Sequence, residues 1–283
     1  MTTVADLLRD ACATLATVSP TPQLDAALLL AHALDKNTTW LKTWPDYAVA
    51  GREAGYCGEL LQRRVAGEPV AYILGSQPFW TLDLLVTPET LIPRPETELL
   101  VEKVLQLMPA DEPIRVLDLG TGSGAIALAL ASERPEWHIL GCDQSPGALA
   151  VAQRNQQRLG LEVEWLASDW FAQVPAMRLD VVVSNPPYVE AGDPHLRSGD
   201  VRFEPLSALV SGEDGLRDIR RIVSETRRYL RFGGLLIVEH GYNQAELVRE
   251  LFSLSGYEKI ESCRDLAGHE RVTLGFHTDS GVA

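Results

Sequence analysis

The stretch "SNPPYV", Ser184–Val189, follows the apolar run "LDVVV" and places an amide, two prolines and a phenol ring where a strand is expected to end. A planar NH2 group is a poor nucleophile because its lone pair is delocalised. The side-chain oxygen of Asn185 and the carbonyl oxygen of Pro186 can each accept one of its hydrogens, which aims the lone pair at an electrophile. Pro187 adds rigidity, and Tyr188 can lie flat against a planar acceptor. The alternative is an ordinary strand end, since Asn-Pro is also a turn signal.

A second feature is the glycine-rich segment "VLDLGTGSGAIALAL", in which Asp118 precedes Gly120, Gly122 and Gly124. Glycines at a strand-to-helix turn let the backbone approach a ligand that a side chain would exclude. Such turns occur without ligands as well, so the segment alone is weak evidence.

Two further strand ends carry groups suited to a nucleoside. Asp143 follows the last glycine by roughly 20 residues, the spacing at which an acid accepts hydrogen bonds from ribose hydroxyls. Asp169 and Trp170 end the next run and offer an acceptor and a flat surface for an adenine ring. Three consecutive strand ends therefore predict one nucleoside-binding site.

The identity of the nucleoside follows from charge. Gly122, Gly124 and Ala127 also fit the fingerprint of nicotinamide enzymes, so an NAD-dependent oxidoreductase is a rival interpretation. Asp118, however, would repel a pyrophosphate and suits an ammonium group. S-adenosylmethionine has an amino acid at one end and adenosine at the other, and "DLGTGSG" resembles the cofactor loop of class I methyltransferases.

The elements that must position these residues change character along the chain. The N-terminal part has helical spacing of apolar residues, "FWTLDLLVTPETLIP" alternates as a short hairpin would, and apolar runs then alternate with helical stretches. This pattern predicts a helical domain over 1–76, a hairpin linker over 77–95 and a catalytic domain over 96–283. The expected fold class is α/β, a doubly wound, mostly parallel sheet of seven strands with an antiparallel pair at the end.

Composition narrows the environment and the partners. No apolar run reaches the roughly 18 residues of a membrane span and no signal peptide is evident, so we expect a cytoplasmic protein without membrane contact. The formal charge of -14 disfavours a nucleic-acid partner. The four cysteines lack CxxC spacing, so no metal site is expected. A cleft that admits a whole protein makes a monomer the simplest expectation.

Several further segments resemble the peptide-chain release factor glutamine methyltransferases over nearly the whole length. They occur in the family's order: "GEPVAYILG", "TLIPRPETELLVE", "SDWF", "NPPYV" and "DVRFEPLSAL". The resemblance implies transfer of a methyl group to the glutamine of a Gly-Gly-Gln loop, with S-adenosylhomocysteine as the other product. It implies glutamine binding by Asn185–Tyr188, and it implies cofactor binding by Asp118, Gly120, Thr121, Gly122, Ser123, Gly124, Asp143, Asp169, Trp170 and Asn185.

Two alternatives stay open beside the oxidoreductase: methylation of an exocyclic amine of a nucleic-acid base, and methylation of a ribosomal-protein glutamine. A predicted helix over Leu216–Arg231 carries six arginines that suggest RNA binding, although its apolar side favours a solvated amphipathic helix. Arg94 could meet a carboxylate or brace the linker. His240 at a strand end is expected to be a hydrogen-bonded core residue.

Overall fold

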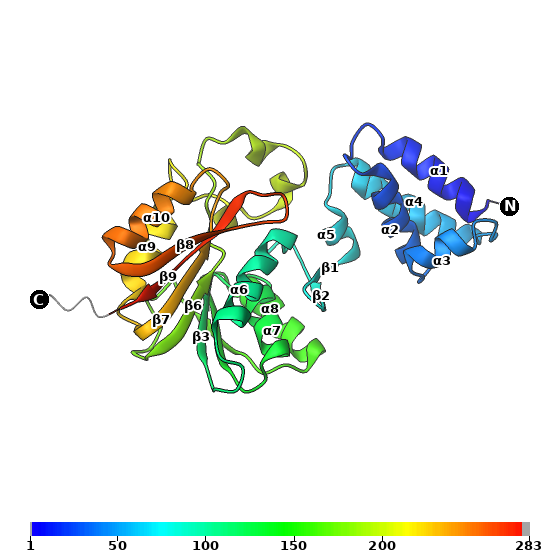
Figure 1. Cartoon of the computed structure of the whole chain (residues 1–283). Coiled ribbons are helices and arrows are strands. Elements are labelled where there is room, and N and C mark those ends of the chain that lie inside the picture. The colour runs from blue at the N-terminus through cyan, green and yellow to red at the C-terminus, as the bar shows by residue number, and fades with distance from the viewer. Residues whose placement is uncertain (1, 279–283) are drawn as a thin grey trace, which may run out of the picture. The chain divides into compact units, whose positions relative to one another are not determined.

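The apolar runs after residue 113 form one seven-stranded sheet in the computed structural model, which describes residues 2–278 (Figure 1). The strand order is β5-β4-β3-β6-β7-β9-β8, and β9 alone runs antiparallel to its neighbours. The strands are β3 Arg115–Leu119, β4 His138–Asp143, β5 Glu164–Ala167, β6 Leu179–Ser184, β7 Leu230–Glu239, β8 Tyr257–Arg264 and β9 Glu270–His277. The predicted fold class is confirmed.

Helices cover both faces of this sheet, which is why its central strands are apolar on both sides. Val181 and Val183 of β6 pack into one core with α6 and α7, whereas Val182 packs into the other with α9 and α10. Figure 1 shows α6, α7 and α8 on one side of the sheet and α9 and α10 on the other. The helices are α6 Glu98–Leu107, α7 Ala125–Glu133, α8 Pro146–Leu159, α9 Arg217–Thr226 and α10 Ala245–Leu254.

The position of the site follows from the strand order. From β3 the chain proceeds outward through β4 and β5, then returns to β6 on the other side of β3. The direction of strand succession therefore reverses between β3 and β6. In open α/β sheets ligands bind beyond the carboxyl ends of the strands at such a reversal.

The chain divides into two compact units. The first comprises the chain up to Ser76 together with Arg197–Phe203, and the second comprises Gln77–Leu196 and the chain from Glu204 onward. Residue 1 and residues 279–283 of the expected domains lie outside the described residues. The first unit contains α1 Val4–Leu15, α2 Pro22–Ala33, α3 Thr38–Thr43, α4 Gly51–Val65 and α5 Val70–Leu74.

Within the first unit, the later segment Arg197–Phe203 is attached by charge. The buried guanidinium of Arg64 lies 2.7 Å from a carboxylate oxygen of Asp25 and 2.7 Å from one of Asp200. The sequence pattern did not predict this return of the chain, because helical periodicity carries no information about a partner more than a hundred residues away.

The hairpin expected in the linker is present, with β1 Ser76–Phe79 paired to β2 Leu82–Leu85. The helix expected over Leu216–Arg231 is shorter than predicted, because α9 ends at Thr226 and Leu230 already pairs with Leu179 of β6. Strand pairing overrides the continuing amphipathic pattern there. Among the described residues, no helix has the length and apolarity needed to cross a bilayer.

Candidate cofactor and substrate site

A pocket opens in the second unit at the carboxyl ends of β3, β4 and β6. The glycine-rich turn, the end of β4 and the stretch after β6 contribute to it, together with linker residues and the segment after Glu204. Of the residues predicted from the sequence, the pocket wall contains Gly120, Thr121, Gly122, Ser123, Asp143, Asp169, Trp170, Asn185 and Pro187. The wall also contains residues that were not predicted, among them Glu89, Thr90, Leu91, Pro93, Thr97, Pro205, Ser207 and Ala208.

The glycine-rich turn has the backbone shape that glycine permits. Gly120 and Gly122 have φ values of 72° and 57°, in the left-handed region that other residues rarely adopt. A Cβ atom on Gly120 would lie 3.3 Å from the ring of Trp170. The turn therefore leaves a cradle between the backbone and an aromatic ring, which a larger residue at position 120 would narrow.

Gly124 has a different role from the two preceding glycines. It is the N-cap of α7 with φ of 84°, and a Cβ there would lie 2.9 Å from Trp165 and 3.0 Å from Leu128. Gly124 thus allows the helix to pack closely on its neighbours and does not belong to the pocket wall.

Asp118 is fully buried beneath the turn. Its Oδ2 accepts hydrogen bonds from the Thr121 hydroxyl at 2.6 Å and the Ala127 amide at 3.3 Å, and burial raises its pKa to about 7. Within residues 2–278 its Oδ1 has no hydrogen-bond partner. The structure therefore places this carboxyl where it holds the turn through Thr121, and not in the pocket wall.

Asp143 is held firmly at the end of β4. Its two carboxylate oxygens accept hydrogen bonds from the backbone amides of Gly122 and Ser145, each at 2.9 Å, and burial raises its pKa. Each oxygen retains lone-pair capacity for a second donor. A carboxylate so fixed, in the pocket wall, fits the two hydroxyls of a ribose.

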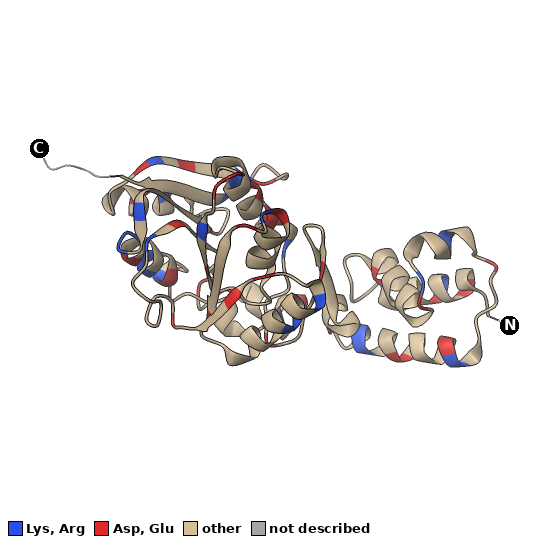
Figure 2. Cartoon of the chain, turned by 90° about the horizontal axis from the view of Figure 1, so that it is seen from below, with Lys and Arg blue, Asp and Glu red and all other residues tan. Residues whose placement is uncertain are grey.

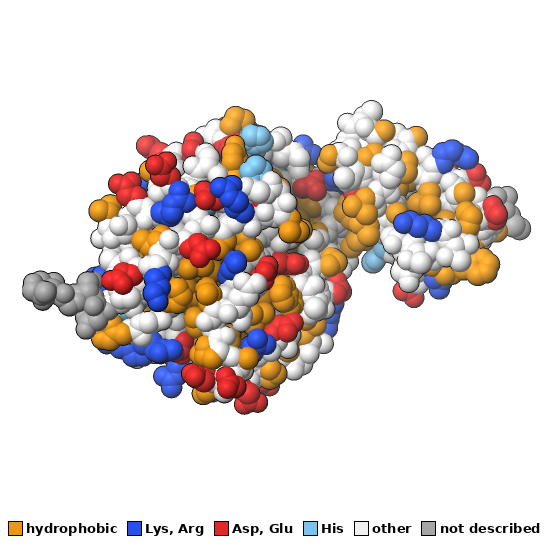
Figure 3. All heavy atoms as spheres, viewed as in Figure 1, with side chains coloured by type: hydrophobic (Ala, Val, Ile, Leu, Met, Phe, Trp, Pro, Cys, Tyr) orange, Lys and Arg blue, Asp and Glu red, His pale blue; other side chains and the backbone are white. Residues whose placement is uncertain are grey.

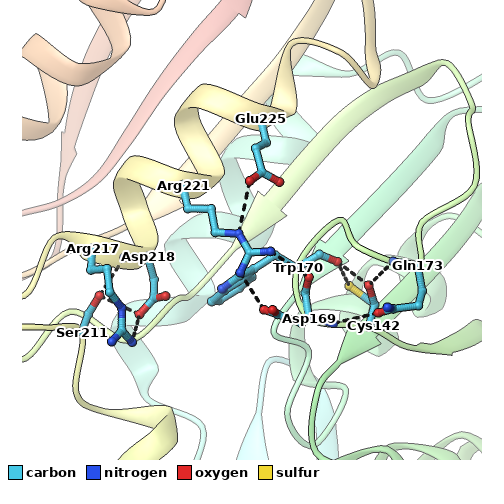
Figure 4. Close-up of polar contacts among 10 residues, drawn as sticks. Cys142, Asp169, Trp170, Gln173, Ser211, Arg217, Asp218, Arg221 and Glu225 are labelled. Carbon is cyan, nitrogen blue, oxygen red and sulfur yellow. Dashed lines mark hydrogen bonds and ion pairs between the residues drawn. The ribbon is translucent and has the colours of Figure 1, made fainter.

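Asp169 and Trp170 follow β5. Asp169 pairs with Arg221 of α9, whose Nη1 lies 2.8 Å from its Oδ1, as Figure 4 shows. Trp170 adopts a left-handed backbone conformation with φ of 49°, and its carbonyl oxygen accepts a hydrogen bond from Ser168 at 2.6 Å. This conformation turns the indole ring toward Gly120, where it forms one wall of the pocket.

Asn185 lies in the pocket wall directly after β6. Its Nδ2 donates to the Thr97 hydroxyl at 3.0 Å, so the donor end of the amide is engaged on the protein side. The acceptor end, Oδ1, is the end that remains for a ligand. Thr97 belongs to the turn Pro95–Thr97 before α6.

The rest of the stretch lies deeper. Pro186 is buried and Tyr188 is half-buried, and neither belongs to the pocket wall. The Tyr188 hydroxyl donates to Oε1 of Glu239 at 3.1 Å, and its carbonyl accepts from Gln244 at 3.1 Å. Tyr188 is therefore held at two points, its side-chain hydroxyl and its backbone carbonyl.

Among the residues that sequence reasoning missed, Glu239 and Thr97 are the two that are hydrogen-bonded to the substrate stretch. Glu239 ends β7 and is 1% exposed, and burial raises its pKa to about 7. Its Oε2 accepts from the Thr97 hydroxyl at 2.7 Å across 142 positions of sequence. The one available signal was an acid at the end of an apolar run, which the neighbouring His240 obscured.

Two other predictions have structural outcomes. Arg94 pairs with the fully buried carboxylate of Glu204, which also accepts from the Ile92 amide at 2.9 Å, so Arg94 fastens the linker to the segment that begins at Glu204. His240 is buried and hydrogen-bonded to Thr273 at 2.8 Å and to the Gly241 carbonyl at 2.9 Å. The prediction of a core histidine is confirmed.

The arginines of α9 are largely paired with acids. Arg217 lies 3.0 Å from Asp218, Arg220 lies 2.6 Å from Asp214, and Arg221 contacts both Asp169 and Glu225 (Figure 4). Figure 2 shows basic and acidic residues interspersed along the ribbon, and Figure 3 shows the same mixture of basic and acidic side chains on one face. The helix therefore offers little uncompensated positive charge for a phosphate backbone.

Two family models match the chain. Residues 6–75 match the PrmC N-terminal domain, and residues 95–199 match the methyltransferase small domain. The two matches cover the helical unit and the part of the second unit that contains the glycine-rich turn and Asn185.

Curated relatives match almost end to end. The chain is 52% identical over 276 residues to a release factor glutamine methyltransferase of Pseudomonas aeruginosa, covering 97% of this chain and 99% of the relative. It is 47% identical over 258 residues to the Escherichia coli release factor glutamine methyltransferase, covering 91% and 93% of the two chains.

A solved structure supports the fold. The T. thermophilus 16S rRNA methyltransferase RsmC, in complex with AdoMet and guanosine, superposes with a TM-score of 0.52 at 19% identity, covering 71% of this chain and 49% of that one. At such identity the likeness establishes the methyltransferase fold, and the relatives above establish the family. The chain belongs to the release factor glutamine methyltransferases.

Proposed function

We propose that this protein transfers a methyl group from S-adenosylmethionine to the side-chain amide nitrogen of the glutamine in the Gly-Gly-Gln loop of peptide chain release factors. The observation that carries the proposal is the placement of Asn185 in the same pocket wall as Gly120, Asp143 and Trp170, with its Nδ2 bonded to Thr97 and no partner for its Oδ1 among residues 2–278. A site with nucleoside-binding groups and an aimed amide acceptor suits methylation of a planar NH2 group.

The pocket residues fit the cofactor. Asp143 would hold the ribose hydroxyls, Trp170 would lie against the adenine, and the backbone of Gly120 and Gly122 would approach the ligand without a side chain between them. When bound, S-adenosylmethionine supplies an electrophilic methyl group.

The chain's own residues would orient the acceptor. Oδ1 of Asn185 and the carbonyl oxygen of Pro186 would each accept one hydrogen of the glutamine NH2 group, which restricts rotation of the amide and directs its lone pair. Pro186 and Tyr188 lie outside the wall of the described pocket but flank its wall residue Pro187, so we place the glutamine amide beside that wall. There Tyr188 would pack against the amide plane, with its ring held by the hydroxyl bond to Glu239. The products would be the amide with one added methyl group, S-adenosylhomocysteine, and one proton released from the amide nitrogen.

The alternative of a nucleic-acid amine is tested directly. Protein and labelled S-adenosylmethionine would be incubated with a purified release factor, with ribosomal RNA, and with ribosomal proteins in parallel. We expect label in the release factor alone. Label in RNA would support methylation of a base, and label in a ribosomal protein would support the ribosomal-protein alternative. Absence of S-adenosylmethionine binding would contradict all three methylation hypotheses.

A further inference from the structure

Behind the substrate stretch, four side chains form a continuous hydrogen-bonded chain. Asn185 donates to Thr97 at 3.0 Å, Thr97 donates to Oε2 of Glu239 at 2.7 Å, and Tyr188 donates to Oε1 of Glu239 at 3.1 Å. These side chains come from the turn before α6, from the stretch after β6 and from the end of β7. Three separate elements thus meet at one carboxylate.

The chain has a direction that its chemistry imposes. An ionised carboxylate can only accept hydrogen bonds, and a hydroxyl has a single hydrogen to donate. Thr97 therefore gives its hydrogen to Glu239 and presents a lone pair to Asn185. The NH2 end of the Asn185 amide must face that lone pair, so Oδ1 must face the pocket. A reversed amide would set its oxygen against the Thr97 oxygen without a hydrogen between them.

Burial strengthens these hydrogen bonds, but it also imposes a desolvation cost on the carboxylate. Thr97 is 4% exposed and Glu239 is 1% exposed, so solvent does not compete for these bonds. A buried carboxylate loses hydration, and two hydrogen bonds compensate only part of that loss. Replacing Glu239 by an apolar residue would remove this cost but would also leave Thr97 and Tyr188 without their common acceptor.

We propose that Glu239 is a positioning residue for methyl transfer, which orients the Asn185 amide through Thr97 and the Tyr188 ring through its hydroxyl. This inference rests on the proposed function, because it assumes that Oδ1 of Asn185 receives a hydrogen of the acceptor NH2 group.

The charged groups around Glu239 define its pH response. The pKa of Glu239 is raised to about 7, chiefly by burial. The hydrogen bonds from Thr97 and Tyr188 and the positive charge of Arg271 act to lower this pKa, and the negative charge of Glu96 acts to raise it. Protonation would turn Glu239 into a donor and weaken the fixed direction of the chain. Activity that depends on ionised Glu239 should therefore fall as the pH decreases through about 7.

The decisive comparison is between Thr97→Val and Thr97→Ser. Valine has nearly the shape of threonine and lacks the hydroxyl, whereas serine keeps it. We expect Thr97→Val to lower kcat for release factor methylation by about 10- to 100-fold, the range expected for a misplaced reacting group. Thr97→Ser should restore most of kcat. Affinity for S-adenosylhomocysteine should change far less than kcat.

A matched control is Thr226→Val, which removes another buried threonine hydroxyl, bonded to the Ile222 carbonyl within α9. It should keep wild-type kcat. Wild-type turnover by Thr97→Val would overturn the inference while leaving the proposed function intact. Failure of the wild-type protein to methylate the release factor would overturn the proposed function and this inference with it.

If Thr97→Val does not fold, as judged by circular dichroism, Glu239→Gln decides the matter. Glutamine has no proton to gain, so the decline in kcat below about pH 7 should become clearly smaller in this variant. The pKa of Asp118 is also about 7, and the pH profile of Asp118→Asn measures the share of the decline that belongs to Asp118. The same decline in Glu239→Gln and in the wild-type protein would overturn the inference.

Discussion

At the scale of single residues, the site depends on side chains that are held in place by hydrogen bonds within the protein. Asn185 engages Nδ2 with Thr97, and Asp143 engages both carboxylate oxygens with backbone amides. Each group is therefore held by bonds within the protein and needs little reorganisation when a ligand binds. Such preorganisation is where positioning contributes most to rate.

Asn185→Ala tests the substrate side of the pocket. Loss of one of the two acceptors leaves the target amide free to rotate, and we expect kcat to fall by roughly 100- to 1000-fold, by analogy with removal of an oxyanion-hole donor. Single-turnover methylation of a release factor would measure it, with circular dichroism as the control for folding. Near wild-type turnover would contradict the assigned role.

Asp143→Ala tests the cofactor side. Hydrogen bonds to a charged group contribute about 1.5 to 3 kcal/mol, so the Kd for S-adenosylmethionine should rise by roughly 10- to 100-fold. Calorimetric titration would measure the change. An unchanged Kd would mean that the carboxylate only holds the turn through Gly122 and Ser145.

At the scale of elements, the order of the strands in the sequence predicted which of the candidate residues lie together in one pocket. Gly120, Asp143, Trp170 and Asn185 lie at or just after the carboxyl ends of four consecutive parallel strands, and parallel strands bring these ends to one edge of a sheet. Their meeting in one pocket could therefore be predicted from order alone.

Other features of the site depend on contacts that no local pattern contains. Thr97 and Glu239 lie 142 positions apart and meet only because α6 packs beside β7. Asp118 was predicted to face an ammonium group, and only the fold shows it directed at Thr121 beneath the turn. That role of Asp118 toward the cofactor stays a prediction.

Gly124→Ala tests the packing of α7 on the sheet. The alanine methyl group would collide with Trp165 and Leu128, and the alanine backbone would have to keep the left-handed φ of 84°. We expect a loss of about 2 to 4 kcal/mol in the free energy of unfolding, from strain and overpacking together. Gly160→Ala is the matched control, because Gly160 has φ of 66° with open space around it. Equal losses in the two variants would contradict the packing role.

At the scale of the whole molecule, Asp118 couples stability to pH. Its pKa is 3.8 in an unfolded chain and burial raises it to about 7 in the folded protein. Between these values the folded state keeps a proton that the unfolded state has released. Stability therefore decreases as the pH rises from about 4 to about 7 and stays lower above that range.

Asp118→Asn should remove this contribution. We expect the free energy of unfolding to decline less between pH 4 and pH 7 in the variant, by on the order of 2 to 4 kcal/mol. Urea denaturation across the pH range measures it, with Asp46→Asn on the surface as the control. An equal dependence of the free energy of unfolding on pH in the wild type and in Asp118→Asn would contradict the claim that the buried Asp118 carboxyl binds a proton in the folded state.

The charge of the molecule also bears on its partner. A formal charge of -14, with the arginines of α9 paired to acids, favours a basic protein surface over a phosphate backbone as the partner.

The central claim is that the acceptor is one glutamine of a release factor. Its most direct test is peptide mass spectrometry of a release factor after incubation with this protein and S-adenosylmethionine, beside a substrate whose loop glutamine is replaced by alanine. We predict one added methyl group on the loop glutamine and none on the alanine variant. A methyl group on any other residue, or equal methylation of the two substrates, would contradict the claim.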